Sequence, residues 1–546
     1  MIINNNQYLI LAAGKINYLS LPVNTNSSNS MIPVNGKPVI AWIIEDLIKK
    51  NADVVYIVTR KDDVHLNQFL KRSYINKLKL IIIEVTKTDS ILDSLKLGLE
   101  QVNSQKSVNI LLGDTLITDS LPIESDSIFV QEVKESSRWC LTTFDAQQHI
   151  ERFIEKEPNL HGIMFAACGF YCIDNTKLLA QQTEIAQLAG ERQLSDVLNR
   201  YKSLKPLKGI FAKSWYDFGN IDNLIKAKQQ LLQSRYFNTL TIDPLLNTIT
   251  KVSEFDQKLR NELNWYEDLP ERLKVLTPRI ISKEEHDEKL NLVQEYYGYP
   301  NLAELYLYSD LNSESWYSII KKLLLIHNEL GKYKGELNKE EYFAVYYLKT
   351  KDRLRDLAND VVWRNILAFK NISINGEVYN NITSLETQIE EMCRAISDSG
   401  ECTIIHGDYC LSNILFDINS QITKLIDPRG SFGKKGIYGD PRYDIAKLRH
   451  SIVGNYDFIV SDLFEVENIN NNFKYEIYAH ENAKEIAVLF DEMILSSGYK
   501  LNEIKFIEAL LFISMLPLHK DKPNRQKVMY LQGIKLLKEI VNENSN

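Results

Sequence analysis

Three oxygen-bearing side chains lie close together in one short stretch of the chain. Apolar residues lead into His406-Gly407-Asp408, and Asn413 follows five residues after the aspartate. Two strand-like runs joined by a turn come next, and the second ends at Asp427. Phosphoryl transfer to a hydroxyl requires such a set, because one carboxylate orients the hydroxyl while an amide and a second carboxylate hold Mg²⁺ on a triphosphate. A polar hairpin turn would explain an isolated Asp and Asn, but the strand, the hairpin and the terminal aspartate together favour the phosphoryl-transfer site.

The same stretch resembles the aminoglycoside phosphotransferase and choline kinase superfamily, a branch of the protein-kinase-like fold. The resemblance lies in HGDYCLSN, LIDPRG and GDPRYDIAKL, which follow the family pattern H-G-D-x-x-x-x-N, then I-D, then D-x-x-x-D-I-A. It implies that Asp408 is the catalytic base and that Asn413 and Asp427 bind Mg²⁺. It also implies that Asp444 braces the catalytic loop from the following helix. Pro428-Arg429-Gly430 replaces the aromatic residues common in choline kinases, so the resemblance does not extend to choline as the substrate.

A lysine and a glutamate upstream of this stretch suit the binding of ATP phosphates. Lys251 falls in a strand-like run, and Glu262 falls eleven residues later in a predicted helix. In protein kinases a strand lysine paired with a helix glutamate holds the α- and β-phosphates. Either residue alone would be an ordinary surface charge, but the downstream motif favours the pair. Residues 290–297 resemble the strand that leads to a kinase hinge, where Glu295 and Tyr296 would expose backbone groups to a purine ring.

Composition limits the number of domains and the classes of partner. A chain of 546 residues suggests about three or four domains or lobes. A formal net charge of −8 argues against nucleic acid as a main partner, because no basic surplus is present to neutralise phosphates. No apolar run reaches the roughly 18 residues of a membrane-spanning helix, and the first residues lack the pattern of a signal peptide. The six cysteines show no Cys-x-x-Cys spacing, which is typical of reduced thiols in a cytoplasmic protein.

The segment up to about residue 235 alternates between strand-like and helix-like patterns. Such alternation predicts a doubly wound α/β domain with a mostly parallel sheet and helices on both faces. Ligands of such sheets bind beyond the carboxyl ends of the strands. Three groups of residues are expected there: Leu11-Ala12-Ala13-Gly14, Leu112-Gly113-Asp114 and Trp215-Tyr216-Asp217-Phe218-Gly219.

This segment resembles the sugar-phosphate nucleotidyltransferases, or pyrophosphorylases. LAAG followed by PVNGKPVIAW is similar to the opening of that family, and Phe153-Ile154-Glu155-Lys156 is similar to its F-x-E-K-P substrate segment. The resemblance implies that Asp114 and Asp217 hold Mg²⁺, which would offset the repulsion between a triphosphate and an attacking phosphate. It also implies that Lys156 contacts the phosphate of the acceptor. Either aspartate alone could be a polar cap of a strand, and only their joint order favours the metal site.

The nucleotide-binding loop departs from the family pattern, which reads roughly G-x-G-T-R. Here Gly14 is followed by Lys15-Ile16-Asn17-Tyr18, without a second glycine or an arginine. A family lysine is also missing, because its place reads Asn29-Ser30-Met31-Ile32-Pro33. Lys15 could supply the lost cation. Two interpretations stay open: an active transferase with unusual triphosphate contacts, which we prefer, and a domain that binds without catalysing.

The sequence therefore predicts a fusion of two α/β units. A nucleotidyltransferase-like domain would occupy residues 1–234, and a two-lobed α+β kinase-like fold would follow, with its small lobe at 235–300 and its large lobe at 301–546. The kinase would use ATP to phosphorylate a hydroxyl of a small polar metabolite. The first domain would then couple that phosphate to a nucleoside monophosphate from an NTP, with CTP favoured, and release pyrophosphate. Fusions of this type resemble enzymes that supply activated groups for bacterial capsule or lipopolysaccharide.

The sequence also allows three alternatives to this prediction. The kinase could act alone beside a degenerate binding domain, the chain could be a non-catalytic scaffold, or the second unit could modify an antibiotic. The expected cofactors are Mg²⁺, ATP as phosphoryl donor and an NTP as nucleotidyl donor. The expected partners are small-molecule substrates and nucleotides, with no nucleic acid and no membrane span, and an oligomer is compatible with the sequence.

Overall fold

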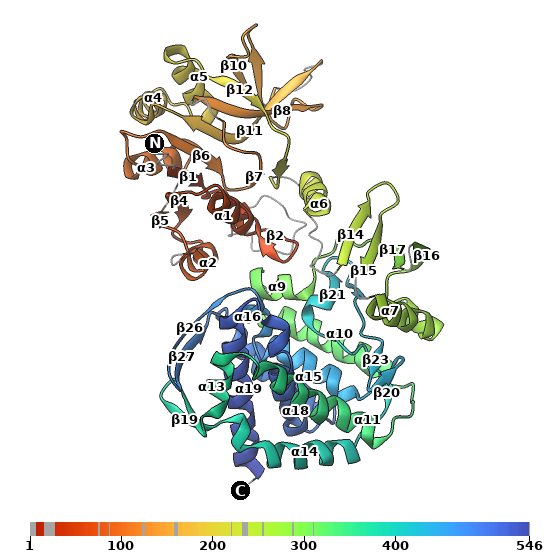
Figure 1. Ribbon diagram of the computed structural model, residues 1–546. Helices are drawn as coiled ribbons and strands as arrows, with labels where there is room; N and C mark the ends of the chain where they lie inside the picture. The colour runs from red at the N-terminus through yellow and green to blue at the C-terminus, as the bar shows by residue number, and fades with distance from the viewer. Residues whose placement is uncertain are drawn as a thin grey trace. The chain divides into compact units, whose positions relative to one another are not determined.

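The chain forms two compact units, Met1–Leu231 and Leu232–Asn546 (Figure 1). The computed structural model describes residues 7–15, 28–74, 77–86, 88–122, 126–157, 162–219, 221–231, 238–253, 256–286, 289–309 and 311–544. The domain boundary predicted after residue 234 lies outside these described residues. Within them, no helix is both long enough and apolar enough to cross a bilayer.

A nine-stranded mixed sheet forms the centre of the first unit. Its parallel part contains, in spatial order, β6 (Val108–Leu112), β1 (Gln7–Leu11), β4 (Val54–Arg60) and β5 (Leu80–Val85). β1 is buried at every position, as expected for a parallel strand that is covered on both faces. The predicted α/β domain is therefore confirmed.

The prediction of a mostly parallel sheet is wrong for the other half of this sheet. β11 (Met164–Ile173) runs antiparallel to β6, and β8 and β9 run antiparallel to β11. Strands linked without a crossover helix pair in antiparallel fashion, and the described residues between β8 and β11, 134–157 and 162–163, contain no helix. The remaining strands of this sheet are β8 (Ser127–Val133), β9 (Cys140–Phe144), β10 (Ile150–Glu155) and β12 (Lys208–Phe211). Two separate two-stranded ribbons are formed by β2 (Pro33–Val34) with β3 (Lys37–Pro38), and by β7 (Thr115–Ile117) with β13 (Trp215–Asp217).

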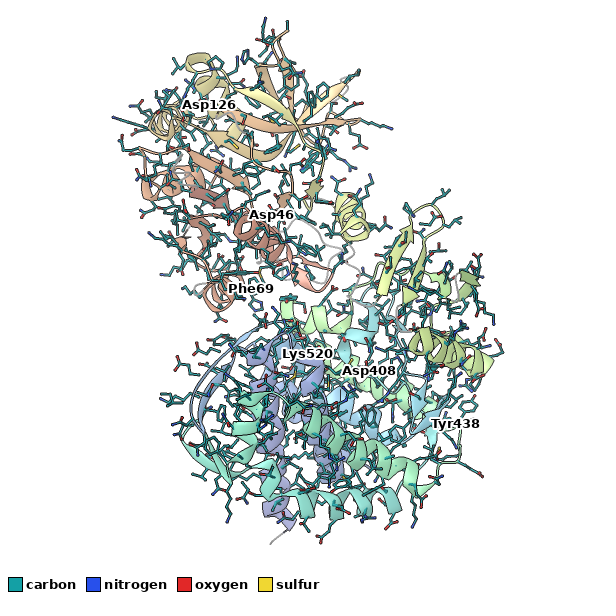
Figure 2. The ribbon with its side chains drawn as sticks, viewed as in Figure 1. Asp46, Phe69, Asp126, Asp408, Tyr438 and Lys520 are labelled. Carbon is teal, nitrogen blue, oxygen red and sulfur yellow. The ribbon has the colours of Figure 1, made fainter. Side chains whose placement is uncertain are left out.

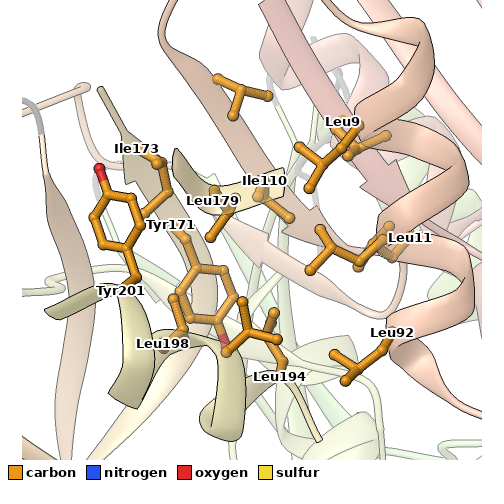
Figure 3. Packing of buried hydrophobic residues seen from close by; sticks show 14 of the residues in the cluster. Leu9, Leu11, Leu92, Ile110, Tyr171, Ile173, Leu179, Leu194, Leu198 and Tyr201 are labelled. Atoms are coloured by element: carbon orange, nitrogen blue, oxygen red, sulfur yellow. The ribbon is translucent and has the colours of Figure 1, made fainter. Parts of the chain in front are cut away.

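Helices cover this sheet and close its core. In α3 (Ile91–Gln101) the buried leucines Leu92, Leu95 and Leu99 recur at helical spacing, and Figure 3 shows Leu92 near Leu11 of β1. Tyr171, Leu179 and Leu198 extend the same core toward the antiparallel strands (Figure 3). The helices of this unit are α1 (Val39–Lys49), α2 (Val64–Tyr74), α3 (Ile91–Gln101), α4 (Thr176–Leu188), α5 (Leu194–Leu204) and α6 (Ile221–Gln230).

The second unit begins with a four-stranded antiparallel sheet in the order β14 (Asn238–Asp243), β15 (Thr248–Ser253), β17 (Lys289–Glu295) and β16 (Ile280–His286). α7 (Asp256–Asp268) packs on this sheet through Leu259 and Leu263, which contact Leu290 and Leu292. This contact fixes the helix against β17, which pairs directly with the strand that carries Lys251.

The rest of the second unit is mainly helical. α18 (Leu501–Ser514) is buried on all sides along its second half, where every residue from Ala509 to Ile513 is apolar and Glu508 pairs with Arg449. The other helices are α8 (Glu271–Lys274), α9 (Leu302–Tyr308), α10 (Ser313–Gly331), α11 (Lys339–Phe343), the π-turn η2 (Ala344–Leu348), α12 (Lys349–Leu357), α13 (Val361–Ala368), α14 (Glu386–Asp398), α15 (Pro441–Ile452), α16 (Tyr456–Val460), α17 (Ala483–Ser496) and α19 (Pro523–Asn544).

Short strands complete this unit. The hairpin of β21 (Ile414–Asp417) and β22 (Ile422–Leu425) matches the sequence prediction for that stretch. A second small sheet, in the order β19 (Glu377–Asn380), β18 (Asn371–Ile374), β27 (Asn472–Ile477) and β26 (Phe464–Ile469), was not predicted, because it joins segments about 100 positions apart. The remaining strands are β20 (Thr403–Ile404), β23 (Ser431–Phe432), β24 (Lys434–Lys435) and β25 (Tyr438–Gly439).

Candidate functional sites

The β7–β13 ribbon brings Asp114 and Asp217 together in the first unit. Asp217 lies opposite Thr115 in this ribbon, and the N–H of Phe218 donates to the carbonyl of Asp114 at 2.9 Å. Both carboxylates lie over the backbone of Gly219. A Cβ at that position would lie 3.1 Å from Oδ1 of Asp217 and 3.4 Å from Oδ2 of Asp114. The two oxygens therefore face one shared point, which a side chain at residue 219 would fill.

The electrostatics of this pair suit a divalent cation. Burial raises the pKa of Asp114, although a hydrogen bond from Asn29 and the charge of Lys156 oppose the shift. Burial, and then the charge of Asp114, raise the pKa of Asp217 to about 6 against a 2.7 Å hydrogen bond from Asn223. Within the described ranges, no group of three or more His, Cys, Asp and Glu side chains forms a metal site. Two carboxylates are nevertheless sufficient for Mg²⁺, which keeps waters and substrate phosphates as its other ligands.

The tripeptide Ser28-Asn29-Ser30 ties this site to the neighbouring loops. Nδ2 of Asn29 donates to Oδ2 of Asp114 at 3.1 Å. The flanking serine hydroxyls donate to the carbonyls of Ala12 and Gly113, each at 2.7 Å. A neutral amide thus contacts the carboxylate from within the stretch Asn29-Ser30-Met31-Ile32-Pro33, which contains no lysine. The sequence showed the lost lysine but not this contact, because Asn29 and Asp114 are far apart in the chain.

A cavity of about 670 Å³ lies beside the Asp114 site, and Gly14 and Lys15 are part of its lining. Residues 16–18 of the predicted nucleotide loop lie outside the described residues. Arg60 also lines the cavity, and its Nη1 donates to the carbonyl of Ala13 at 2.9 Å. Sequence analysis missed Arg60, although a basic residue at the carboxyl end of a parallel strand could have indicated it.

Lys156 lies at the end of β10 on the other side of Asp114. Its backbone has a φ of +40°, and its N–H donates to the carbonyl of Trp139 at 3.0 Å. A positive φ is uncommon for a residue other than glycine and often occurs at functional sites. The rings of Trp139 and Trp215 are 4.8 Å apart in an edge-to-face contact, so an aromatic pair lies next to both Lys156 and Asp217.

In the second unit, Lys251, Glu262 and Asp427 form a buried ion cluster. Nζ of Lys251 lies 2.7 Å from Oε2 of Glu262 and 2.6 Å from Oδ1 of Asp427. Burial lowers the pKa of Lys251, but the charges of Asp427 and Glu262 outweigh it, so the net shift is upward and the lysine stays charged. Burial raises the pKa of Glu262 to about 7 against the charge of Lys251. The predicted ion pair is therefore present, and its role in holding ATP stays a prediction.

The β21–β22 hairpin places Asn413 beside Asp427, since the N–H of Ile426 donates to the carbonyl of Asn413 at 3.0 Å. Nδ2 of Asn413 donates to Oδ2 of Asp408 at 2.9 Å. The amide oxygen of Asn413 is thus the atom that could face a metal. The hard oxygen donors of Asn413 and Asp427 fit Mg²⁺.

Asp408, labelled in Figure 2, pairs through Oδ1 with Nζ of Lys447 at 2.9 Å. Burial raises the pKa of Asp408, but the charge and hydrogen bond of Lys447 outweigh it and bring the pKa well below its ordinary value. The carboxylate is therefore ionised and can accept a hydrogen bond from a hydroxyl. Lys447 was not predicted, although it lies three residues after Asp444 within the quoted motif.

Asp444 on α15 fixes the loop that carries Asp408. Its two carboxylate oxygens accept hydrogen bonds from the backbone N–H groups of His406 at 2.6 Å and Gly407 at 2.8 Å. Gly407 has a φ of +76°, which favours glycine at this turn. Burial raises the pKa of Asp444 to about 7 against these two hydrogen bonds.

The prediction that Glu295 and Tyr296 expose backbone groups to a purine ring stays a prediction, and the structure shows which of these groups remain available. The N–H of Glu295 donates to the carbonyl of Arg279 at 3.0 Å, and the N–H of Tyr296 donates to the carbonyl of Asn247 at 2.8 Å. Both donors are used within the sheet, because β17 has neighbours on both sides. Neither N–H is available to a purine ring, and only the carbonyl groups of these two residues could serve.

Comparison with known proteins identifies the first unit. Residues 7–234 match the nucleotidyl transferase family. The first unit is a nucleotidyl transferase domain. The bifunctional protein GlmU of Methanocaldococcus jannaschii is 26% identical over 229 residues, which cover 41% of this chain and 54% of that protein. GlmU of Methanococcus aeolicus is 26% identical over 232 residues with the same coverage. The chain thus spans about half the length of the curated relatives it matches.

Solved structures also align with this chain. CTP:phosphocholine cytidylyltransferase from Streptococcus pneumoniae is 16% identical, with a TM-score of 0.35, and the alignment covers 42% of this chain and 99% of that one. HddC from Yersinia pseudotuberculosis is 18% identical, with a TM-score of 0.35, and the alignment covers 41% and 99%.

Proposed function

We propose that this protein is a bifunctional enzyme. The second unit phosphorylates a hydroxyl of a small polar metabolite with ATP. The nucleotidyl transferase domain then couples that phosphate to a nucleoside monophosphate, with CTP as the favoured donor, and releases pyrophosphate. The observation that carries the proposal is the set of polar groups in the second unit, where Asp408, Asn413 and Asp427 lie on one loop and hairpin with Lys251 in contact with the last of them. The product would be an activated precursor for a surface glycan, made in the cytoplasm.

In the kinase step, the hydroxyl oxygen of the acceptor attacks the γ-phosphorus of ATP. The bond from that phosphorus to the β,γ-bridging oxygen breaks, and ADP leaves. Asp408 orients the hydroxyl and accepts its proton, and Lys251 holds the α- and β-phosphates. Asn413 and Asp427 would hold Mg²⁺, which neutralises charge on the phosphates. Lys447 keeps Asp408 ionised, so that it can act as the base.

In the transferase step, an oxygen of the acceptor phosphate attacks the α-phosphorus of the NTP. The bond from that phosphorus to its bridging oxygen breaks, and pyrophosphate leaves. Lys156 contacts the acceptor phosphate, while Lys15 and Arg60 lie in the cavity that would receive the nucleotide. Asp114 and Asp217 would hold Mg²⁺ between the two anions, where it reduces their repulsion.

A kinase with a silent nucleotidyl transferase domain is the second candidate. It is favoured by the lack of a lysine in the stretch Asn29-Ser30-Met31-Ile32-Pro33, from which only the neutral amide of Asn29 contacts Asp114. Arg60 also favours this candidate, because its Nε is already engaged in an ion pair with Oδ1 of Asp62 at 3.0 Å. Under this reading the first unit would bind the phosphorylated product without converting it.

The two candidates differ in pyrophosphate release. Purified protein is given ATP, Mg²⁺ and a panel of alcohols, aminoalcohols and sugars, with each NTP in turn, and both ADP and pyrophosphate are measured. Pyrophosphate that depends on one acceptor and one NTP is the expected result. Asp408→Asn should abolish both products, and a chemically phosphorylated acceptor should restore pyrophosphate alone. ADP without pyrophosphate under every NTP would leave the kinase-only candidate, and no ADP with any acceptor would refute both.

A further inference from the structure

A group of basic side chains gathers near Asp408, and three of its four members act on the hydroxyl of Tyr443. Its members come from separate parts of the second unit and meet only in the folded chain. Two come from α12, one from the loop after Asp427 and one from α15. We call them the basic cluster: Lys349, Arg353, Arg429 and Lys447.

Arg429 lies directly beside the loop that carries Asp408. A Cβ on Gly407 would lie 2.8 Å from Cβ of Arg429, so only a glycine leaves room for the arginine. Nη1 of Arg429 donates to the hydroxyl of Tyr443 at 3.0 Å. Lys447 reaches the same place from α15 and contacts Asp408.

Lys349 comes from an irregular turn of helix. The π-turn η2 precedes it, and its own N–H donates to the carbonyl of Ala344, five residues earlier. Single π-turns inside helices are frequent at functional sites, because they re-aim the following side chains. Here the turn lies between α11 and α12 and is followed at once by Lys349.

The basic cluster has an excess of positive charge. Tyr443 raises the pKa of Lys349, but burial and the charges of Arg429, Lys447 and Arg353 outweigh this and lower the pKa to about 8. Burial raises the pKa of Tyr443, yet the charges of Lys349, Arg429 and Lys447 lower it to about 8. Cations that disfavour one another in this way are stabilised when an anion enters among them.

The basic cluster also lacks balancing carboxylates. Within the described part of the second unit, Lys447 is paired with Asp408, whereas Lys349, Arg353 and Arg429 have no carboxylate within ion-pairing distance. All three are half-buried rather than fully exposed. Lys351, only two residues after Lys349, provides a contrast, because its Nζ pairs with Glu386 at 2.7 Å.

We propose that the basic cluster binds an anionic group of the acceptor, so that the substrate of the second unit is a small alcohol that carries a carboxylate or a phosphate. This inference rests on the proposed kinase activity and names its substrate class. Its position fits, since Lys447 contacts Asp408, which would orient the acceptor hydroxyl, and Arg429 lies beside the loop that carries it. Lys251 pairs instead with Glu262 and Asp427, so the cation proposed for the ATP phosphates is a separate group. A quaternary amine or a polyamine would be repelled at this place.

The test is a series of acceptors that differ only in charge. Glycerol, D-glycerate, glycerol 3-phosphate and serinol share a three-carbon skeleton, and ribitol, ribonate and ribitol 5-phosphate form a second series. ADP formation is measured for each with Mg²⁺–ATP. We expect at least one anionic member to exceed its neutral analogue by about tenfold or more in kcat/KM, with serinol the poorest. The carboxylate and phosphate members distinguish the two sources of negative charge. A preference for glycerol, ribitol or serinol would overturn the inference while leaving the kinase proposal intact.

Variants of the basic cluster test its role directly. Arg429→Gln and Lys349→Gln should raise KM for the anionic acceptor by about tenfold and leave KM for ATP within about twofold. The control Lys351→Gln lies on the same helix and should change neither constant. A rise in KM for ATP alone would assign the cluster to the nucleotide and overturn the inference.

A binding measurement covers the case in which no acceptor in either series reacts. With Mg²⁺–ADP present in excess, the melting temperature is measured with sodium sulfate and with sodium chloride at equal ionic strength. Sulfate should stabilise the wild type more than the Arg429→Gln and Lys349→Gln variants. Equal stabilisation of all three proteins would overturn the inference. Failure of Mg²⁺–ADP itself to stabilise the protein would instead refute the kinase proposal.

Discussion

Asp444 connects α15 to the loop that carries Asp408, and its substitution gives the sharpest test of the second unit. The carboxylate accepts two backbone hydrogen bonds at 2.6 and 2.8 Å and is completely buried. An asparagine at this position would accept one of these two hydrogen bonds through its amide oxygen. Its NH₂ group would face the other backbone N–H, which would lose its acceptor. Losing one hydrogen bond to a charged group costs ~1.5–3 kcal/mol. We therefore expect Asp444→Asn to lower the free energy of unfolding of the second unit by roughly 2–4 kcal/mol, with the buried donor left unpaired.

The same change should slow the kinase step. A loop shift of about 1 Å is enough to reduce the rate by about 100-fold, because the base and the acceptor hydroxyl no longer align. ADP formation and the urea midpoint are measured for the wild type and the variant. Pyrophosphate release from a pre-phosphorylated acceptor should be unchanged, which shows that the first unit is intact. The matched control is Asp462→Asn, in a partly exposed pair with Arg525 at 2.6 Å, where a loss of no more than about 1 kcal/mol is expected. ADP formation within twofold of the wild type, together with an unchanged midpoint, would refute the proposed bracing by Asp444.

Three other predictions concern both units. Asp217→Asn should reduce pyrophosphate release by about 100-fold or more while ADP formation continues, and an equal loss of both products would contradict separate sites. Gly219→Ala places a methyl group 3.1 Å from Oδ1 of Asp217 and 3.4 Å from Oδ2 of Asp114, so it should raise the Mg²⁺ concentration needed for pyrophosphate release; an unchanged Mg²⁺ titration would argue against a shared metal position. Burial raises the pKa of Glu508 to about 7 against Arg449. Between about pH 4 and pH 7 the folded chain therefore holds a proton that the unfolded chain releases. The free energy of unfolding should fall by ~1–3 kcal/mol as the pH rises through this range. Glu508→Gln should flatten this dependence in urea titrations at pH 5 and pH 8.

Short-range patterns in the sequence predicted much of both candidate sites. Asp408 and Asn413 are five residues apart, and the loop between them and the hairpin that follows Asn413 form from local contacts. The Lys251–Glu262 pair joins a strand to the helix that follows it directly, so its spacing could be read from the chain. The parallel part of the first sheet was predictable for the same reason, because each strand and its crossover helix are neighbours in sequence.

Contacts between distant segments could not be predicted in this way. The antiparallel half of the first sheet depends on how β11 pairs with β6, β8 and β9, and strand-like patterns carry no information on pairing direction. The sequence could not show which backbone groups of Glu295 and Tyr296 are used within the sheet, because it does not show which strands flank β17. The sequence indicated a role for Arg60 in the cavity only through its position at the end of a strand.

The sequence by itself determined which chemical groups this protein possesses: two aspartates and a lysine suited to nucleotidyl transfer, and an Asp-Asn-Asp set suited to phosphoryl transfer. Their order along the chain was enough to assign the nucleotidyl transferase domain. Tertiary structure alone decided what surrounds those groups. Asn29 meets Asp114, Lys447 meets Asp408, and Lys349 joins Arg429 at Tyr443, although these residues lie far apart in the chain. The physical reason is that charge interactions depend on distance in space and on burial, and neither is fixed until the helices and strands have packed together.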